Sequence, residues 1–579
     1  GHIARIPQSC PPPLPGNETR TTMFLRSLTQ TLARQSVTSE AVVTAASSAT
    51  LPLSQKNTSS VRSFHSTSST PYAGAVGSTA SVLTASAASA ASPSLLVQLI
   101  GERVLQEEHK DVLRSCEQVY EDDSLRMTWT ELKKYADAIS CGLYEGRVRP
   151  GHRMGLQMKN DAETLFSFLA CSQLGVESVF LPPVASAGAR LESERLAELQ
   201  QAQQASKPAV KDRSDEGYAP VHDVTPAVPS HLTAYAVRPS PVCPSLRLES
   251  TYALEAAQLR GVMIAPHHCT MWRKIIPELA LSLVEGEAPH SPTHPQFKVP
   301  VQIGFEYERQ FYNLMHILVH HPSRNPLNRI VPTLQPDQVA ATYWNHDHGV
   351  QFTQQTTRTV GEATAHQLKL TRDSRVCVAA PMHTSTALSS CLATLAARGV
   401  LILPSLELDP ATIVENARGD VADTLVLTES NVDAVLSAAA KAKNRNGHAI
   451  SRVVVTRDAA NSSSPALDWS QVRTRASDLL GTSELVLASG TEGTFGACLY
   501  SGSGEGSLGK PLSGAAEVQV VDNAGKALKK GRGLLQVRGA SVMHSVLGNA
   551  SNAPVLGKDG WLSTGVAVEQ HADGSFSSA

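Results

Sequence analysis

Short apolar runs alternate with amphipathic helical segments through most of this 579-residue chain. A turn and strand in "RPGHRMGLQMKN" precede a helix and strand in "DAETLFSFLACSQLGVESVFLPP". The alternation returns in "VCVAAPMHTSTALSSCLATLAARGVLILP", in "TLVLTESNVDAVLSAAAKA", and in the runs "SRVVVT" and "SELVLAS". Strands separated by helices at this spacing usually pair in parallel within one sheet. The pattern therefore predicts an α/β fold.

An amphipathic helix is predicted in "MTWTELKKYADAISCGLYEG". We expect Thr130 to cap its start, because a threonine hydroxyl can accept a hydrogen bond from a free backbone N–H of the first turn. Gly142 or Gly146 is expected to mark its end.

Two regions depart from the α/β pattern. Residues 184–250 combine a charged helix with a Pro-rich stretch, and they are interpreted as an insertion between a first α/β segment, 95–183, and the remaining core, 251–505. Residues 506–579 carry short β runs separated by "DNAG" and "KKGRG" turns. Such runs are typical of antiparallel strands and predict a small β-barrel subdomain.

The first 94 residues are interpreted as upstream sequence, a mitochondrial transit peptide and a flexible linker. From Met23, "MFLRSLTQTLARQS" places its apolar side chains near one helical face, and Glu18 and Glu40 are the only acidic residues before Glu102. An Arg-bearing, Ser-rich and acid-poor amphipathic start is typical of such peptides. "VRSFHSTSST" has the form of a matrix-protease cleavage site. We therefore expect the protein in the mitochondrial matrix or on the matrix side of the inner membrane; a disordered Ser/Ala-rich tail is the alternative.

Composition excludes several functional classes. The formal net charge is -2, so no bulk attraction to nucleic acid is expected, and no direct nucleic-acid partner is predicted. Nine cysteines occur without a Cys-x-x-Cys pair, which argues against a disulfide framework or a zinc knuckle. No apolar stretch is long enough to predict a transmembrane segment.

Several sequence blocks occur in an order that is shared with a known family. "MTWTELKKYADAISCGLYEGRVRPGHRMGLQMKN" has the form of a "TY-x-EL" helix followed by a "PGD-x-V" turn, with Trp129 in place of Tyr and His152 in place of Asp. "PMHTS" places His383 at the histidine of a "P-L-x-H" motif, and "SGTEGTFG" matches most of a "YG-x-TE" motif. Over residues 95–183 and 336–576 the chain thus resembles the adenylate-forming acyl-CoA synthetases and their relatives.

The resemblance implies the large N-terminal portion of such an enzyme, with two α/β subdomains and a small β-barrel subdomain. Members of the family activate a carboxylic acid with ATP, usually before transfer to coenzyme A. Their C-terminal lid domain brings a catalytic lysine to the site. Here only thirteen residues follow Val566, so we expect neither the lid nor that lysine in this chain.

The phosphate-binding loop of the family is a Ser/Thr/Gly-rich segment that ends in a lysine. Such loops need glycine so that the backbone can approach the phosphate closely. At the corresponding place this chain has "WNHDHG", with Gly349 as its one glycine, no lysine, and Asp347, whose charge would repel a phosphate. Asp347 and Gly349 are therefore interpreted as lost nucleotide-site positions.

Other nucleotide contacts can be compared residue by residue. The resemblance places Thr491 near the α-phosphate and Glu492 at a magnesium ion, and Gly490 and His383 also match; these four are interpreted as vestigial site positions. Thr491 and Glu492 could instead simply cap the turn after a strand. Ser489 replaces the aromatic residue beside the adenine, and Val566 replaces the aspartate that accepts both ribose hydroxyls, so both count as lost positions.

Other chemistry is weakly indicated. His316 and His320 stand four residues apart in "LMHILVHH", but nothing nearby is spaced to complete a metal site. No G-x-S-x-G motif occurs. We predict no catalytic residue, no metal ligand and no cofactor.

The leading hypothesis is a non-catalytic acyl-CoA synthetase-like protein that serves as an accessory subunit of a large mitochondrial assembly, such as a respiratory complex or the mitochondrial ribosome. Its expected partners are the other subunits of that assembly. The alternatives are an atypical ATP-dependent acyl-CoA ligase that uses Thr491 and Glu492, and a module that holds an acyl or coenzyme A ligand without chemistry.

Overall fold

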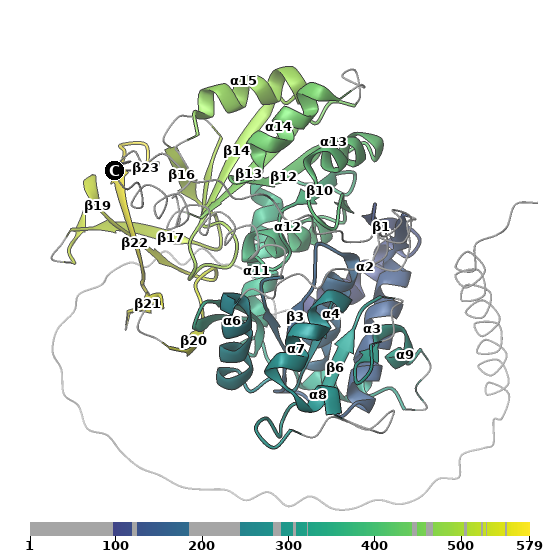
Figure 1. Ribbon diagram of the computed structural model, residues 1–579. Helices are drawn as coiled ribbons and strands as arrows, with labels where there is room; N and C mark the ends of the chain where they lie inside the picture. The colour runs from purple at the N-terminus through teal and green to yellow at the C-terminus, as the bar shows by residue number, and fades with distance from the viewer. Residues whose placement is uncertain are drawn as a thin grey trace, which may run out of the picture. The chain divides into compact units, whose positions relative to one another are not determined.

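The structure is a computed structural model, shown in Figure 1, and all its described residues belong to the unit Ala87–Ala579. It describes residues 96–117, 124–183, 244–281, 291–304, 308–320, 322, 324–442, 448–458, 467–502, 507–522, 525–528, 530–549, 553–557 and 559–578. The predictions made for residues 1–94, and for the insertion up to residue 243, lie outside these residues.

Eight strands form one sheet, called sheet B here, in the order β20-β9-β8-β4-β3-β5-β6-β7. The neighbours from β8 to β7 run parallel, whereas β9 is antiparallel to β8 and to β20. The strands β4, β5 and β6 are buried along their whole length, as expected for parallel strands covered on both faces. The bounds are β3 Arg153–Gln157, β4 Glu177–Phe180, β5 Gly261–Ile264, β6 Val299–Gln302, β7 Tyr312–Asn313, β8 Val339–Asn345, β9 His348–Thr353 and β20 Ser545–Gly548.

Fifteen strands form the second sheet, sheet A, in the order β18-β17-β19-β22-β23-β16-β15-β14-β13-β12-β10-β11-β1-β2, with β21 paired to β22. In this order the neighbours from β14 to β1 run parallel, and the other neighbouring pairs, including β14 with β15 and β1 with β2, run antiparallel. The bounds of the first group are β1 Asp111–Ser115, β2 Leu125–Thr128 (antiparallel to β1), β10 Arg375–Ala379, β11 Val400–Leu403, β12 Thr424–Thr428, β13 Arg452–Asp458 and β14 Glu484–Gly490. Those of the second are β15 Leu499–Ser501, β16 Ser507–Pro511, β17 Glu517–Val521, β18 Ala527–Leu528, β19 Gly531–Arg538, β21 Val555–Leu556, β22 Leu562–Gln570 and β23 Phe576–Ser578.

Helices cover both faces of each sheet. Alternate residues of a strand face opposite sides. In β10, for example, Val376 and Val378 join the core that holds α2, α3, α4, α11 and α12, while Cys377 joins the core with α13, α14 and α15. The far face of sheet B packs on α6 and α7. The helix bounds are α2 Leu96–Glu107, α3 Trp129–Glu145, α4 Ala162–Leu174, α6 Pro244–Ala256, α7 Cys269–Ile275, α8 Glu278–Leu281, α9 Leu314–Ile317, α10 Leu327–Ile330, α11 Gln354–Gln367, α12 Ser385–Ala396, α13 Pro410–Gly419, α14 Val432–Lys441 and α15 Trp469–Leu480, with 3-10 turns at Pro266–His268 and Val331–Thr333.

The predicted α/β fold is thus confirmed, and so are the antiparallel strands near the C-terminal end. The hydrogen bonds of β15 and β16 join those antiparallel strands to the parallel part of sheet A. Helix α6 begins at Pro244, inside the range interpreted as an insertion. Within the described residues, no helix combines the length and the apolar character that crossing a bilayer requires.

The predicted cap of α3 was wrong. The helix begins at Trp129 and Thr128 caps it: the Thr128 hydroxyl accepts from the Glu131 N–H, and the Glu131 carboxylate accepts from the Thr128 N–H at 2.8 Å. This reciprocal pair is a capping box. Thr130 instead donates its hydroxyl to the Glu108 carbonyl at 3.0 Å, which ties α3 to the end of α2. The predicted end at Gly146 is confirmed.

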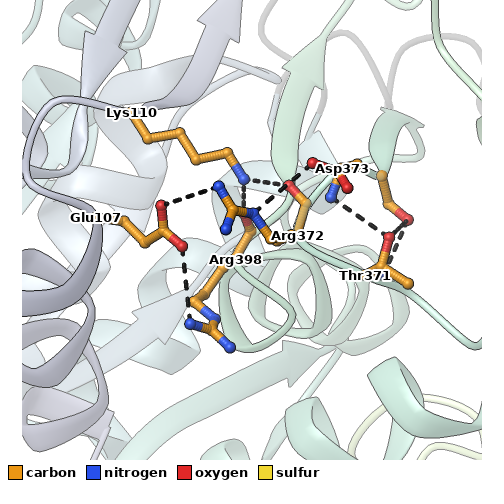
Figure 2. Close-up of polar contacts among 7 residues, drawn as sticks. Glu107, Lys110, Thr371, Arg372, Asp373 and Arg398 are labelled. Carbon is orange, nitrogen blue, oxygen red and sulfur yellow. Dashed lines mark hydrogen bonds and ion pairs between the residues drawn. The ribbon is translucent and has the colours of Figure 1, made fainter.

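A polar cluster fastens the end of α2 to the turns that follow α11 and α12 (Figure 2). Lys110 Nζ donates to the carbonyl of Arg372 and, at 2.8 Å, to the carbonyl of Arg398. Glu107 lies 3.8 Å from the Arg372 guanidinium and 3.7 Å from that of Arg398. The first described helix is therefore held to the parallel part of sheet A by charge as well as by packing.

Candidate functional site

A tight hairpin joins β8 and β9 where the sequence pattern places the phosphate loop. Its turn consists of His346 and Asp347, and His346 has a φ of +53°, in the left-handed region. The indole Nε1 of Trp344 donates to the His346 carbonyl at 3.1 Å. Gly349 is required by packing, because a Cβ there would lie 2.7 Å from the Trp344 ring. The hairpin is therefore closely packed around Trp344.

Two further elements hold this turn. Strand β20 pairs with β9, and Asn549, just after β20, donates its backbone N–H to the Asp347 carbonyl at 3.1 Å and its Nδ2 to the Asp347 carboxylate at 2.9 Å. From α6, which contacts β20 (Figure 1), Glu249 lies 3.0 Å from Nδ1 of His346. The turn is thus attached to two other parts of the chain.

Glu492 lies against the same hairpin, two residues after the end of β14. Its Oε1 accepts a hydrogen bond from Nδ2 of Asn345 at 2.8 Å. Nε2 of His348 lies 2.9 Å from the same oxygen, as an ion pair whose N–H is bent away from a straight hydrogen bond. His348 is 3% exposed, and its Nδ1 lies 3.1 Å from Asp347 Oδ1. One histidine therefore links two carboxylates.

The protonation states follow from these contacts. The contact with Glu492 raises the pKa of His348, burial opposes the shift, and Asp347 adds to it. Burial alone would raise the pKa of Glu492, but the contact with His348 and the hydrogen bond from Asn345 outweigh it and lower that pKa. His348 likewise lowers the pKa of Asp347. The cluster thus favours a charged histidine between two carboxylates.

The turn after β14 is closed by Thr494 rather than by Thr491. The Thr494 hydroxyl accepts from the Thr491 N–H at 3.0 Å and is 2.9 Å from the Thr491 carbonyl. In the described part of the chain, the buried hydroxyls of Thr491 and Ser489 have no hydrogen-bond partner. Gly490 is constrained by space, since a Cβ there would lie 2.6 Å from the Gly496 carbonyl. This segment therefore presents two unsatisfied hydroxyls near Glu492.

His383 and Val566 stand apart from the hairpin contacts. His383 is half-buried, directly before the α12 cap Thr384, and burial lowers its pKa to about 4. Val566 lies in a bulge of β22, where the register to β19 shifts and Gly565 has a φ of +69°. It packs at the margin of the core.

The structure brings together Asp347, Gly349 and Glu492 from two distant segments. Ser489, Gly490 and Thr491 lie at the end of the strand that leads to Glu492. Sequence reasoning missed Asn345 and His348 as partners of Glu492, although both stand in the quoted "WNHDHG" segment. The signal that could have predicted these contacts is the position of the two polar side chains, one directly before the turn and one directly after it.

A metal would have few ligands here. Among the residues that the structure describes, no group of three or more His, Cys, Asp and Glu side chains could hold a metal ion. Glu492 could offer only Oε2, because Oε1 already accepts from Asn345 and contacts His348. Hard cations such as magnesium need several oxygen ligands, which phosphates often supply.

Comparison with known proteins gives one family. Residues 347–547 match the family of AMP-binding enzymes, a region that includes Asp347, strand β9, Glu492 and most of β20. No curated protein matches the chain by sequence.

Solved structures with this fold cover most of the chain. A protein described as a long-chain-fatty-acid CoA ligase from Rhodopseudomonas palustris superposes with a TM-score of 0.60 at 15% identity, covering 84% of this chain and 98% of its own. The N-terminal domain of FACL13 from Mycobacterium tuberculosis gives 0.59 at 13% identity, covering 84% and 99%. A benzoate CoA ligase from Burkholderia xenovorans gives 0.57 at 14% identity, covering 84% and 79%. The resemblance inferred from the sequence blocks is confirmed.

Proposed function

We propose that this chain is a member of the family of AMP-binding enzymes, which it matches over residues 347–547, and that it keeps their fold without their chemistry, as an accessory subunit of a larger mitochondrial assembly. The observation that carries the proposal is the ion pair between His348 and Glu492. The carboxylate that the family pattern assigns to magnesium is bound instead by the chain's own hairpin.

The pair opposes nucleotide binding in two ways. A magnesium ion at Glu492 would be limited to Oε2, because a bond to Oε1 would displace Asn345 or His348 and leave a buried polar group without a partner at a cost of about 1–3 kcal/mol. A charged His348 would also repel the cation at close range. Binding a metal here is therefore opposed by contacts that already satisfy the site.

The hairpin opposes phosphate binding as well. A phosphate loop offers several free backbone N–H groups. The turn here has two residues, and its one carboxylate, Asp347, is held in place by Asn549. At the ribose position, the Val566 side chain has no acceptor for a hydroxyl. Three independent positions thus support a loss of nucleotide binding.

The role as a subunit is supported by the sequence. A retained scaffold with altered nucleotide contacts is what selection for binding rather than catalysis would leave. The transit-peptide pattern in residues 1–94 supports the matrix, or the matrix side of the inner membrane, as its location. The proposed partners are the neighbouring subunits of that assembly.

The first experiment measures the native particle. Gently solubilised mitochondria are separated by native electrophoresis, and the proteins that migrate with this chain are identified by mass spectrometry. Migration in a large defined complex is expected. Migration as a free monomer or dimer would contradict the subunit role.

The second experiment tests the chemistry on the purified full chain. ATP binding and ATP-dependent pyrophosphate exchange are expected to be absent. The enzymatic alternative, an atypical ligase, predicts exchange that Glu492→Gln abolishes. Exchange in the parent chain that disappears in this variant would overturn the non-catalytic proposal.

A second candidate function, a module that holds an acyl or coenzyme A ligand, is favoured by the unsatisfied hydroxyls of Thr491 and Ser489. Buried hydroxyls usually have a partner, so a bound ligand would explain both. Native mass spectrometry of the protein from mitochondria would reveal a retained ligand as a defined mass increment. Thr491→Val should reduce the fraction that carries it.

A further inference from the structure

Four basic side chains lie where β3 and β5 begin, at the amino-terminal ends of the parallel strands of sheet B. We call this end the amino edge and the opposite end, where the strands finish, the carboxyl edge. We call Arg147, Arg149, His152 and Arg260 the amino-edge cluster. The first three stand in the connection from α3 to β3, and Arg260 directly precedes β5, to which β3 is paired. The hairpin with His348 follows the carboxyl end of β8, so the two sites lie at different edges.

The connection has a defined conformation. The His152 N–H donates to the Arg149 carbonyl at 3.0 Å, and the Arg149 N–H donates to Nδ1 of His152 at 3.0 Å. Because Nδ1 is an acceptor, the neutral ring carries its proton on Nε2. The Arg149 guanidinium lies 3.8 Å from the Tyr144 ring centre and donates to the Val148 carbonyl at 2.9 Å. His152 and Arg149 are thus held in fixed positions.

Arg260 is attached to the same edge. Its N–H donates to the Arg153 carbonyl at 2.8 Å, and its Nη1 donates to the Gln296 carbonyl at 3.1 Å. Its Nε is buried and has no hydrogen-bond partner in the described part of the chain. A buried guanidinium N–H without an acceptor is costly, and the Nε atoms of Arg103, Arg114 and Arg457 are in the same condition.

No carboxylate balances this charge among the described residues. Arg147, Arg149 and Arg260 make no ion pair there, and the segment "GRVRPGHR" contains no acidic residue. Burial lowers the pKa of Arg260, and Arg147 and Arg149 lower it further. The nearest acid–base pair, Arg153 with Glu177 at 2.7 Å, is already complete, and Glu177 also accepts from Gln351. The cluster is therefore electrostatically unsatisfied.

Ion pairs are frequent among the other described arginines. A carboxylate lies within ion-pair distance of each of Arg114, Arg153, Arg273, Arg358, Arg372, Arg375, Arg398, Arg452, Arg457, Arg475, Arg532 and Arg538. The amino-edge cluster is distinguished by three arginines that lie near one another without such a partner among the described residues.

We propose that the amino-edge cluster binds a phosphate group, carried by a small soluble ligand or by a lipid headgroup. Guanidinium groups match the geometry of phosphate oxygens and donate paired hydrogen bonds to them. Several positive charges within one turn favour an anion of more than one charge over a single carboxylate. The Nε2–H of His152 adds a neutral donor beside them.

The test uses the purified full chain with two probes. Calorimetry at low salt measures binding of sodium pyrophosphate, and sedimentation measures binding to phosphatidylcholine vesicles with and without phosphatidylglycerol. Arg260→Gln should weaken whichever binding occurs by about tenfold. Arg473→Gln, an exposed arginine on α15 with the same change of charge, is the matched control and should change it less than about twofold.

The two arms distinguish the sources. Pyrophosphate binding that is lost in Arg260→Gln identifies a soluble phosphate ligand, and vesicle binding that is lost in the same variant identifies a headgroup. Arg147→Asn is a second variant for the case that Arg260→Gln fails to fold, because Arg147 is exposed and asparagine tolerates its φ of +64°. No binding of either probe would overturn the proposal, as would equal losses in Arg473→Gln.

A spectroscopic readout separates specific binding from general attraction. The pKa of His152 is lowered by burial and then by Arg260 and Arg149. An anion seated between them would offset that repulsion and raise the pKa of His152, which NMR of the imidazole Cε1–H reports, with His152→Gln for assignment. An unchanged titration of His152 at saturating pyrophosphate would contradict binding at this cluster.

Discussion

The charged side chains at the two edges of sheet B differ in whether they have partners of opposite charge. At the carboxyl edge, His348 lies between Glu492 and Asp347; Asn345 donates to the Glu492 oxygen that His348 contacts, and Asn549 donates to the second oxygen of Asp347. At the amino edge, three arginines face one another without a carboxylate among the described residues.

The difference indicates at which edge existing contacts would oppose ligand binding. A ligand at the carboxyl edge must displace existing partners, so its binding energy is reduced by the contacts that it breaks. A ligand at the amino edge would supply missing acceptors and relieve repulsion. Glu492 and Asp347 thus already have partners within the chain, whereas the arginines at the opposite edge have no carboxylate partner among the described residues.

The largest effect on stability is expected from disrupting the packing around Trp344. A valine at Gly349 would place Cβ 2.7 Å from Thr342 Cγ2 and from the Trp344 ring. We expect Gly349→Val to lower the free energy of unfolding by about 2–3 kcal/mol, measured by urea denaturation. Gly101→Ala in α2 is the control, because nothing lies within 4 Å of a Cβ there, and it should raise stability by about 0.5–1 kcal/mol. Equal stability of Gly349→Val and the parent would refute the tight hairpin.

The next largest effect is expected from breaking the ion pair between Glu492 and His348. Glu492→Ala leaves His348, which is 3% exposed, without its main partner. We expect a loss of about 2 kcal/mol in the free energy of unfolding. A double-mutant cycle with His348→Gln isolates the coupling between the two side chains. A coupling energy near zero would mean that the pair does not fasten the hairpin.

The pH dependence of stability is a further test of the ion pair between His348 and Glu492. His348 has a raised pKa, so its contribution is fully present below its ordinary value of 6.5 and is lost as pH rises through the higher folded value. Glu492 has a lowered pKa, so its contribution is present above 4.5 and is lost as pH falls through the lower folded value. The stability difference between the parent and His348→Gln should therefore be largest between pH 4.5 and 6.5, at about 1–2 kcal/mol.

The control for this profile is His366→Gln, an exposed histidine at the end of α11. Its loss should change the free energy of unfolding by less than about 0.5 kcal/mol. A difference for His348→Gln that stays constant from pH 5 to 9 would contradict the charged pair.

The smallest effect is expected at the amino edge. Arg147→Asn removes one of three repelling charges and places asparagine at a positive φ. We expect stability to rise by about 0.5 kcal/mol in the absence of phosphate, measured by thermal unfolding. A loss of stability instead would show that Arg147 already has a partner.

Much of the fold could be predicted from the sequence, because strand and helix periodicity are local. The α3 cap failed for a local reason too: Thr128 and Thr130 both flank Trp129, and only Thr128 has a glutamate three residues later to complete the capping box. The positions Asp347 and Glu492 came from the family pattern. Their link through His348 could not be predicted, because it depends on the pairing of β8 with β9 and on where β14 ends in the other sheet.

Strand β20 has a consequence for folding during synthesis. It pairs in sheet B, yet β19 before it and β22 after it pair in sheet A, so a short segment late in the chain completes the edge of an early sheet. Contacts so distant in sequence form slowly, because loop closure must precede them. Until Ser545–Gly548 leaves the ribosome, β9 presents an unpaired edge of the kind that nucleates aggregation. The edge of β9 would therefore need protection during translation from the synthesis of β9 until that of β20.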